Sequence, residues 1–363
     1  MLSMKKHIVC ELTAITIYTV SSFFSVCTAA GIQNGSDYYN LLLDDEKVSS
    51  SVKDIASESS LFDTGKYFSG KSTVKDVLDC KEFSGFAELL VPKTDKKDLN
   101  VHLNEFQKLM PYHHNVTVKN TVESLDYLYE TVKRGEQVFY PIYTSDCIKD
   151  NKSLKDTGIF YFRGKKNAPF ALILSGGYYY KSLIHEGFPL ALKLSHAGYN
   201  AFVLSYRQKK SLYGSLDLIK AVNFIINNHR MFGVSKSGFS LWGASSGAQV
   251  IISAIHATNS RTAAGLKMSE PAVNIYTSPI SFYATKEDPP TFIVVGENDK
   301  IVNKTVLKSS AANLNNLHIK AKYAELPRLE HGFGLGLDTD STGNSNWINS
   351  AIAFWEDNKN DLK

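Results

Sequence analysis

Short apolar runs alternate with longer segments of helical periodicity through the second half of the chain. Continuous apolar runs are typical of strands that are buried on both faces of a parallel sheet. We expect such strands at residues 170–174, 200–206, 239–242, 272–276, 291–296 and 319–326. Helices are expected at 186–197, 216–228, 246–256, 305–314 and 347–355. This alternation predicts a mostly parallel central sheet with helices on both faces.

The chain before residue 136 has a different pattern. Residues 31–135 combine Ser-rich polar stretches with apolar residues at helical spacing, and no strong strand pattern is present there. Two aromatic and β-branched runs then follow, at 138–143 and 158–162, and predict a hairpin. We therefore expect a mainly helical N-terminal extension or lid at 31–135 and an α/β domain at 136–363.

Residues 1–30 have the pattern of a secretory signal peptide. Lys5 and Lys6 precede an apolar stretch at 8–26, and small residues follow at 27–30. We expect a secreted, periplasmic or cell-envelope protein with no stable membrane insertion after cleavage. Glu11 interrupts the apolar stretch, and the alternatives are an uncleaved anchor and a buried N-terminal helix.

Composition narrows the class of protein further. Apolar residues make up 43% of the chain and charged residues 21%, which is typical of a globular protein with a core. The net charge of +4 is small for 363 residues. The pairs Lys165-Lys166 and Lys209-Lys210 are expected to be solvated surface, so we expect no nucleic-acid partner. The oligomeric state is left open.

Cysteine and histidine spacing does not indicate a metal site. After signal cleavage only Cys80 and Cys147 would remain, and they could form one disulfide or stay as two thiols. The chain has no Cys-x-x-Cys pair. His113 and His114 are adjacent and cannot both face one side of a helix, which favours a loop packed near the α/β domain. We expect neither a metal nor a cofactor.

The strand expected at 239–242 runs into Gly243-Ala244-Ser245-Ser246-Gly247, a Gly-x-Ser-x-Gly pattern. In a sharp strand-to-helix turn, this pattern exposes a strained serine whose hydroxyl can act as a nucleophile. The two glycines let the strand and the helix pass close to the turn. The N-terminus of the following helix favours negative charge. We therefore expect Ser245 to be a catalytic nucleophile.

Two later strands are followed by the partners that such a serine needs. Asp299 follows the strand at 291–296, and His331 lies in a Gly-containing loop after the last strand. Ligands bind beyond the carboxyl ends of parallel strands, so these side chains are expected near Ser245. The order Ser245, Asp299, His331 matches nucleophile, acid and base. The alternatives are Glu297 as the acid and His185 or His318 as the base.

Other loops at the same edge supply an expected oxyanion hole and pocket. Gly176 and Gly177 follow a buried strand, and their backbone N–H groups, with that of Ser246, could bind the oxyanion of a tetrahedral intermediate. Gly177 is slightly favoured over Gly176. Arg207, just after a strand, could bind a substrate carboxylate or form a structural ion pair. Three aromatic residues are expected to line the substrate pocket: Tyr178, Tyr179 and Trp347.

From about residue 139 to 355 the chain resembles the α/β-hydrolase superfamily, closest to acetyl-esterase-like and prolyl-oligopeptidase-like serine hydrolases. The resemblance rests on residues 174–178, 198–207, 243–247, 296–299 and 331–334. Many relatives have His before the oxyanion glycines, where this chain has Leu174-Ser175. The resemblance does not cover residues 31–135.

The resemblance implies an α/β-hydrolase fold and a Ser-His-Asp triad that works without a cofactor. It also implies a small-molecule ester substrate with a short acyl group, and carbohydrate esters are the favoured class. A serine peptidase of prolyl-oligopeptidase type and a longer-chain lipase, with residues 36–135 as a lid, are the alternatives. A non-catalytic binding protein is less favoured.

Overall fold

The computed structural model describes residues 67–92, 95–110, 113, 115–177, 183–208, 211–259, 267–336 and 346–360. The expected signal peptide lies outside these residues. So do two of the aromatic residues expected at the pocket, Tyr178 and Tyr179.

The centre of the molecule is an eight-stranded sheet with the strand order β1-β2-β4-β3-β5-β6-β7-β8. Strands β1 and β2 run antiparallel to their neighbours, and all pairs from β4 to β8 are parallel. The mostly parallel sheet predicted from the apolar runs is therefore confirmed. The strands are β1 (Phe139–Pro141), β2 (Gly158–Phe162), β3 (Phe170–Leu174), β4 (Asn200–Ser205), β5 (Ser240–Ala244), β6 (Val273–Thr277), β7 (Thr291–Gly296) and β8 (Ala321–Leu326).

The antiparallel pair at the start of the sheet is more elaborate than the predicted hairpin. Phe139 of β1 lies opposite Phe160 of β2, as the two aromatic runs suggested. The connection between the strands is not a tight turn, because it contains α6 (Ser145–Asp150) and the 3-10 helix η5 (Lys152–Leu154). The side chain of Thr144 caps α6 by accepting a hydrogen bond from the Cys147 N–H, and this local capping is what starts the helix.

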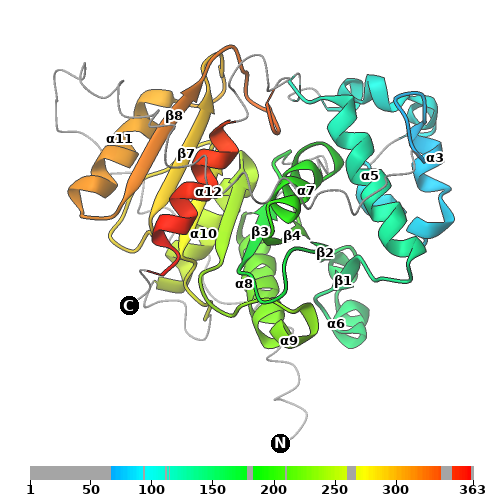
Figure 1. The fold of residues 1–363 in the computed structure, drawn as a ribbon, viewed down its shortest axis with the longest axis horizontal. Coiled ribbons are helices and arrows are strands. Elements are labelled where there is room, and N and C mark those ends of the chain that lie inside the picture. The colour runs from blue at the N-terminus through cyan, green and yellow to red at the C-terminus, as the bar shows by residue number, and fades with distance from the viewer. Residues whose placement is uncertain are drawn as a thin grey trace, which may run out of the picture.

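Helices cover both faces of the sheet (Figure 1). Side chains alternate along each strand, so Trp242 of β5 joins the core beneath α7 and α12, whereas Leu241 joins the core beneath α8, α10 and α11. Two separate apolar cores result, one on each face. The helices that follow β3 are α7 (Phe188–His196), α8 (Ser211–Asn227), α9 (His229–Phe232), α10 (Ser246–Asn259), α11 (Lys304–Asn316) and α12 (Asn346–Asn358), and a π-helical turn η6 (Leu183–Gly187) precedes α7.

The described part of the N-terminal extension packs on the α7 side of the sheet. Figure 1 shows α5 beside α7 and α3 on the far side of α5, at the opposite end of the molecule from α11 and β8. Buried Phe106 and Leu125 of the extension belong to the same core as Phe162 and Phe188 of the α/β domain. The elements are α3 (Val74–Leu78), α4 (Ala87–Leu90), α5 (Val118–Lys133) and the 3-10 helices η2 (Lys81–Phe83), η3 (Lys96–Asn100) and η4 (Leu103–Leu109). The extension and the α/β domain therefore share a core.

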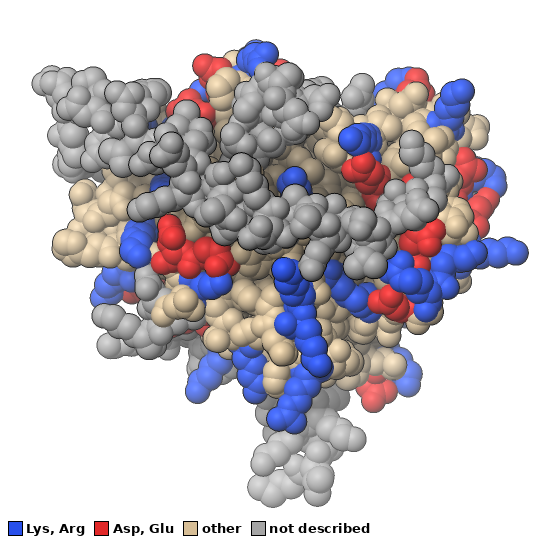
Figure 2. Space-filling view, in the orientation of Figure 1, with Lys and Arg blue, Asp and Glu red and all other residues tan. Residues whose placement is uncertain are grey.

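Three predictions from the sequence concern surface charge, membrane insertion and the pairing of Cys80 with Cys147. Lys and Arg side chains and Asp and Glu side chains are both spread over the face seen in Figure 2. Among the helices that the structure describes, none combines the length and the apolar character needed to cross a bilayer. Cys80 carries a free thiol, so it does not form a disulfide with Cys147.

Candidate active site

The Gly-x-Ser-x-Gly segment forms a sharp turn between β5 and α10. Ser245 has a φ of 47°, in the left-handed region that non-glycine residues rarely occupy. Its N–H donates to the carbonyl oxygen of Thr277 at the end of β6, 2.9 Å away, which holds the strained residue in place. The residue is half-buried. The turn therefore presents a serine hydroxyl at the carboxyl edge of the sheet.

The two glycines of this segment allow close backbone approach. A Cβ atom on Gly247 would lie 2.2 Å from the carbonyl oxygen of Leu174 in β3. A Cβ on Gly243 would lie 2.6 Å from the Cα of Ala248 in α10. Both distances are far below van der Waals contact, so a side chain at either position would force the backbone apart. The glycine requirement argued from the sequence thus has a direct steric cause.

Three side chains from different loops form one hydrogen-bonded chain. Ser245 Oγ lies 2.8 Å from His331 Nε2, and His331 Nδ1 lies 2.8 Å from Asp299 Oδ2. Asp299 follows β7 and His331 follows β8, as the sequence predicted. The structure therefore brings the expected nucleophile, base and acid within hydrogen-bond reach of one another.

The alternative acid and base have other partners. Glu297 is exposed, and its Oε2 accepts a hydrogen bond from the backbone N–H of Arg328. His185 is buried, and its Nδ1 lies 2.7 Å from Thr121 Oγ1. His318 lies just after α11, ahead of β8, and so before that strand and not after it. His331 is thus the histidine that contacts Ser245.

The surroundings of Asp299 favour its ionised form. Burial would raise the pKa of Asp299, but the hydrogen bond from His331, the nearby Ser278 hydroxyl and the hydrogen bond from the Ile301 N–H outweigh it and hold the pKa below its usual value. The second carboxylate oxygen accepts from the N–H groups of Ile301, at 2.8 Å, and Val302, at 3.2 Å. A carboxylate can only accept hydrogen bonds, so the proton lies on His331 Nδ1. Nε2 is then an acceptor for the Ser245 hydroxyl.

The loop after β3 differs from the prediction at one glycine. The N–H of Gly176 donates to Glu186 Oε2 at 2.6 Å. This bond takes Gly176 out of the predicted set of oxyanion donors, because an N–H already given to a buried carboxylate is not available to substrate. Gly177 has a φ of 98°, which suits a residue without a side chain, and Ser246 begins α10. These two residues remain as the expected donors.

Glu186 is the residue of the site that sequence reasoning missed. Its carboxylate is buried, and Oε1 lies 3.8 Å from Nε2 of the buried His113 of the extension. Burial would raise the pKa of Glu186, but His113, the Gly176 N–H and the charge of His331 together lower it. His113 was expected in a loop near the α/β domain, and it lies against that domain. No local pattern pairs residues so far apart in sequence.

Comparisons with known proteins identify solved structures of similar fold. No protein-family model matches the chain, and no curated protein matches its sequence. The acetyl ester-xyloside bifunctional hydrolase from Caldicellulosiruptor lactoaceticus has a similar structure, with a TM-score of 0.50 and 17% sequence identity over 60% of this chain and 95% of that one. The carboxylesterase Cest-2923 from Lactobacillus plantarum WCFS1 aligns with a TM-score of 0.49 and 14% identity, over 55% and 92% of the two chains. MGS-M1, an α/β hydrolase from a Medee basin deep-sea metagenome library, aligns with a TM-score of 0.46 and 18% identity, over 57% and 93%.

The chain has the α/β-hydrolase fold. The strand order, the antiparallel start of the sheet and the turn that carries Ser245 all agree with that assignment. In this fold the loops after β3, β5, β7 and β8 meet at one edge of the sheet. That arrangement explains why Ser245, Asp299 and His331 lie together, with Gly176 beside Ser245, although they are spread over the chain.

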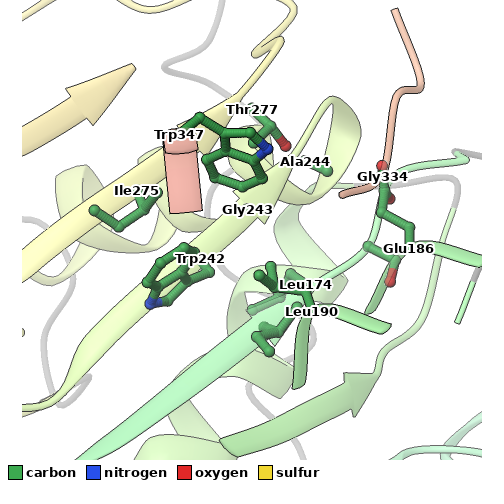
Figure 3. A pocket seen from close by; sticks show the side chains of 12 residues that line it. Leu174, Glu186, Leu190, Trp242, Gly243, Ala244, Ile275, Thr277, Gly334 and Trp347 are labelled. Carbon is green, nitrogen blue, oxygen red and sulfur yellow. The ribbon is translucent and has the colours of Figure 1, made fainter. Parts of the chain in front are cut away.

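In this α/β-hydrolase fold, a small cavity opens beside the turn that carries Ser245 (Figure 3). Its volume is about 20 Å³, which is room for about one water-sized group. Trp347 was expected in the pocket and lines it, with its ring facing the cavity. The other lining residues come from β3, β5, β6, η6, α7 and the loops after β3 and β8: Ile173, Leu174, Ser175, Glu186, Leu190, Trp242, Gly243, Ala244, Ile275, Thr277 and Gly334.

One further candidate from the sequence, Arg207, has a structural partner. Arg207 forms an ion pair with the fully buried Asp217, with Nη2 and Oδ1 2.7 Å apart, which agrees with the structural ion pair that the sequence offered as one of two roles. Within the described residues, no three His, Cys, Asp or Glu side chains gather closely enough to hold a metal ion.

Proposed function

We propose that this chain is a serine hydrolase that cleaves carboxylic esters through an acyl-enzyme. The observation that carries the proposal is the continuous hydrogen-bond chain from Ser245 Oγ through the His331 ring to the Asp299 carboxylate, with both links at 2.8 Å. A serine hydroxyl needs an adjacent base to become a nucleophile, and the base needs a group that fixes its tautomer.

In the proposed reaction Ser245 Oγ attacks the ester carbonyl carbon while His331 Nε2 accepts the hydroxyl proton. Asp299 holds the Nδ1–H tautomer of His331 and stabilises the imidazolium that forms. The tetrahedral intermediate collapses when His331 returns the proton to the leaving alcohol. Water, activated by the same histidine, then attacks the acyl-enzyme and releases the acid.

The oxyanion of each intermediate would be held by two backbone donors. We assign this role to the N–H groups of Gly177 and Ser246. Ser246 begins α10, and the positive end of the helix dipole at that point favours developing negative charge. Removal of one such donor costs about 10²–10³ in kcat in other hydrolases.

The proposed acyl group is short, of acetyl size. The cavity beside the turn has a volume of about 20 Å³ and mostly apolar walls, including Trp242, Ile275 and Trp347. A methyl group fits a space of this size, whereas a long alkyl chain would need side chains to move. The cavity supports acetate over long-chain acids as the released product.

The proposed alcohol part is a carbohydrate, and the proposed location is outside the cytoplasm. The structurally similar acetyl ester-xyloside bifunctional hydrolase is named for acetyl esters. Export through the N-terminal segment would bring this enzyme to extracellular acetylated polysaccharides. An acetylated oligosaccharide should then be cleaved with a higher kcat/KM than nitrophenyl acetate.

The decisive experiment is labelling of Ser245 by a fluorophosphonate probe, with Ser245→Ala as the control. The wild type should be labelled and should hydrolyse nitrophenyl acetate, and the Ser245→Ala variant should do neither. If Ser245→Ala hydrolyses nitrophenyl acetate as fast as wild type, the proposal is wrong. Cleavage of aminoacyl nitroanilides in place of esters would indicate a peptidase, and a preference for long acyl chains would indicate a lipase.

A further inference from the structure

One segment of the N-terminal extension contacts the loop that carries His331. The side chain of Asn115 accepts a hydrogen bond from the backbone N–H of Glu330, with Oδ1 2.9 Å from the nitrogen. Glu330 directly precedes His331. Gly334, three residues after that histidine, lies so close to Val116 that a Cβ there would be 3.2 Å from a Val116 methyl carbon. The extension thus touches the histidine loop on both sides of His331.

The same segment also contacts the loop that follows β3. His113 Nε2 lies 3.8 Å from Glu186 Oε1, and Glu186 Oε2 accepts the Gly176 N–H. Just beyond, Thr121 Oγ1 lies 2.7 Å from His185 Nδ1. These contacts are buried. Neither ring nitrogen of His113 has a partner within hydrogen-bond distance. We call the loop after β3 that contains Gly176 and Gly177 the oxyanion loop. The extension therefore reaches the oxyanion loop through Glu186.

We propose that residues 113 and 115–121 form a bridge that holds the oxyanion loop and the histidine loop in register around Ser245. Its positioning contacts are Asn115 on the histidine loop and His113 on Glu186, which in turn anchors the oxyanion loop. This proposal rests on the proposed function and adds a role for the extension. The bridge fixes the direction of His331 from one side through Asn115. It fixes the direction of the Gly177 N–H from the other side by anchoring the preceding residue, Gly176, to Glu186.

Small shifts in these loops have large kinetic consequences. A displacement of about 1 Å in a catalytic group can cost about 10²-fold in rate. Asn115 is not among the residues that line the cavity proposed for the acyl group, so its loss should lower kcat and leave KM nearly unchanged. Glu186 lines that cavity, so its loss should lower kcat with or without a change in KM. A segment that served stability alone would lower the fraction of folded enzyme and leave kcat per active site unchanged.

The first test compares Asn115→Ala with Asn115→Asp. Aspartate keeps an oxygen that can accept the Glu330 N–H, and alanine does not. We express kcat for nitrophenyl acetate per Ser245 titrated with the fluorophosphonate probe. On this scale the kcat of the alanine variant should be about tenfold or more below that of the wild type, and the kcat of the aspartate variant should be close to that of the wild type. Glu123→Gln is the control, because Glu123 is an exposed carboxylate of the same extension.

The second test compares Glu186→Ala with Glu186→Gln. Glutamine keeps an acceptor for the Gly176 N–H, so it should retain more of kcat than alanine does. Hydrogen–deuterium exchange of residues 175–177 and 330–334 provides a readout that does not depend on activity. Exchange should rise in the corresponding loop in Asn115→Ala and Glu186→Ala, and stay at the wild-type rate in Glu123→Gln.

Two results would overturn the bridge. One is an unchanged kcat per titrated serine in both alanine variants, whether or not exchange rises. The other is exchange in both loops that matches wild type. A wild type that neither labels nor hydrolyses esters refutes the proposed function, and the exchange experiment still decides in that case whether the segment holds the two loops.

Discussion

Asp299→Asn is the substitution that probes the His331 tautomer most directly, because it keeps the size and most of the contacts of the side chain. The asparagine oxygen can still accept from the N–H groups of Ile301 and Val302, which hold Asp299 Oδ1 at 2.8 and 3.2 Å. The amide nitrogen would then face His331 Nδ1, which Asp299 Oδ2 now contacts at 2.8 Å.

An amide NH₂ can only donate, so it would force His331 Nδ1 to be the acceptor. The imidazole proton then moves to Nε2, the atom that lies 2.8 Å from Ser245 Oγ. A protonated Nε2 cannot accept the serine hydroxyl proton. With two of the three Asp299 hydrogen bonds retained and one inverted, we expect the fold to persist and kcat to fall about 10⁴-fold, or about 5.5 kcal/mol in the activation barrier.

The assay is steady-state hydrolysis of nitrophenyl acetate at pH 7–8 with the thermal unfolding midpoint measured in parallel. Asp217→Asn, which removes another buried carboxylate after β4, is the comparison for a purely structural loss. A kcat for Asp299→Asn within about tenfold of wild type, in protein that unfolds at the wild-type temperature, would refute the assignment of Asp299 as the group that sets the tautomer.

Three further changes test the fold and the site. Gly247→Ala places a Cβ 2.2 Å from the Leu174 carbonyl oxygen. The substitution should therefore destabilise the protein by about 1–3 kcal/mol or more and abolish labelling by the fluorophosphonate probe. A thermal unfolding midpoint equal to that of the wild type would contradict the steric argument. Leu190→Ala enlarges the cavity and should raise the ratio of butanoate to acetate hydrolysis about tenfold, whereas Leu192→Ala, on the same helix but away from the cavity, should leave that ratio unchanged. Burial lowers the pKa of His185 from 6.5 to about 3; below pH 6.5 the unfolded chain therefore binds a proton that the folded protein does not, and stability should fall by about 2–3 kcal/mol between pH 7 and pH 4.5. Thermal unfolding at both pH values should show a smaller acid-induced loss of stability in His185→Asn than in the wild type. An equal loss of stability would contradict the conclusion that His185 is buried in its neutral form.

The sequence was informative wherever one local pattern decides the structure. Strand β7 follows from a continuous β-branched run, and its predicted limits match the observed ones. The turn at Ser245 follows from glycines whose absence of a side chain is a steric necessity. Asp299 and His331 could be placed because the carboxyl ends of parallel strands share one edge of the sheet.

The parts that sequence reasoning missed depend on contacts between distant segments. Gly176 was assigned to the oxyanion hole because a Gly-Gly pair after a strand is a common donor, and only the position of Glu186 shows that its N–H is already used. Glu186 lies in the π-helical turn η6, at a place where the apolar pattern predicts the first turn of an ordinary helix. His113 appeared as a loop residue, since nothing near it in sequence pairs with it.

The hydrogen bond between Asn115 and the Glu330 backbone has a consequence for folding. It joins residues 215 positions apart, and the entropy of closing such a loop must be overcome before the contact contributes any stability. Contacts of this range form late, after local helices and neighbouring strands. The geometry around Ser245 is therefore completed only when the segments around Asn115 and Glu330 have met. Regain of the proposed ester hydrolysis during refolding would then report on the whole molecule, and regain of secondary structure would not.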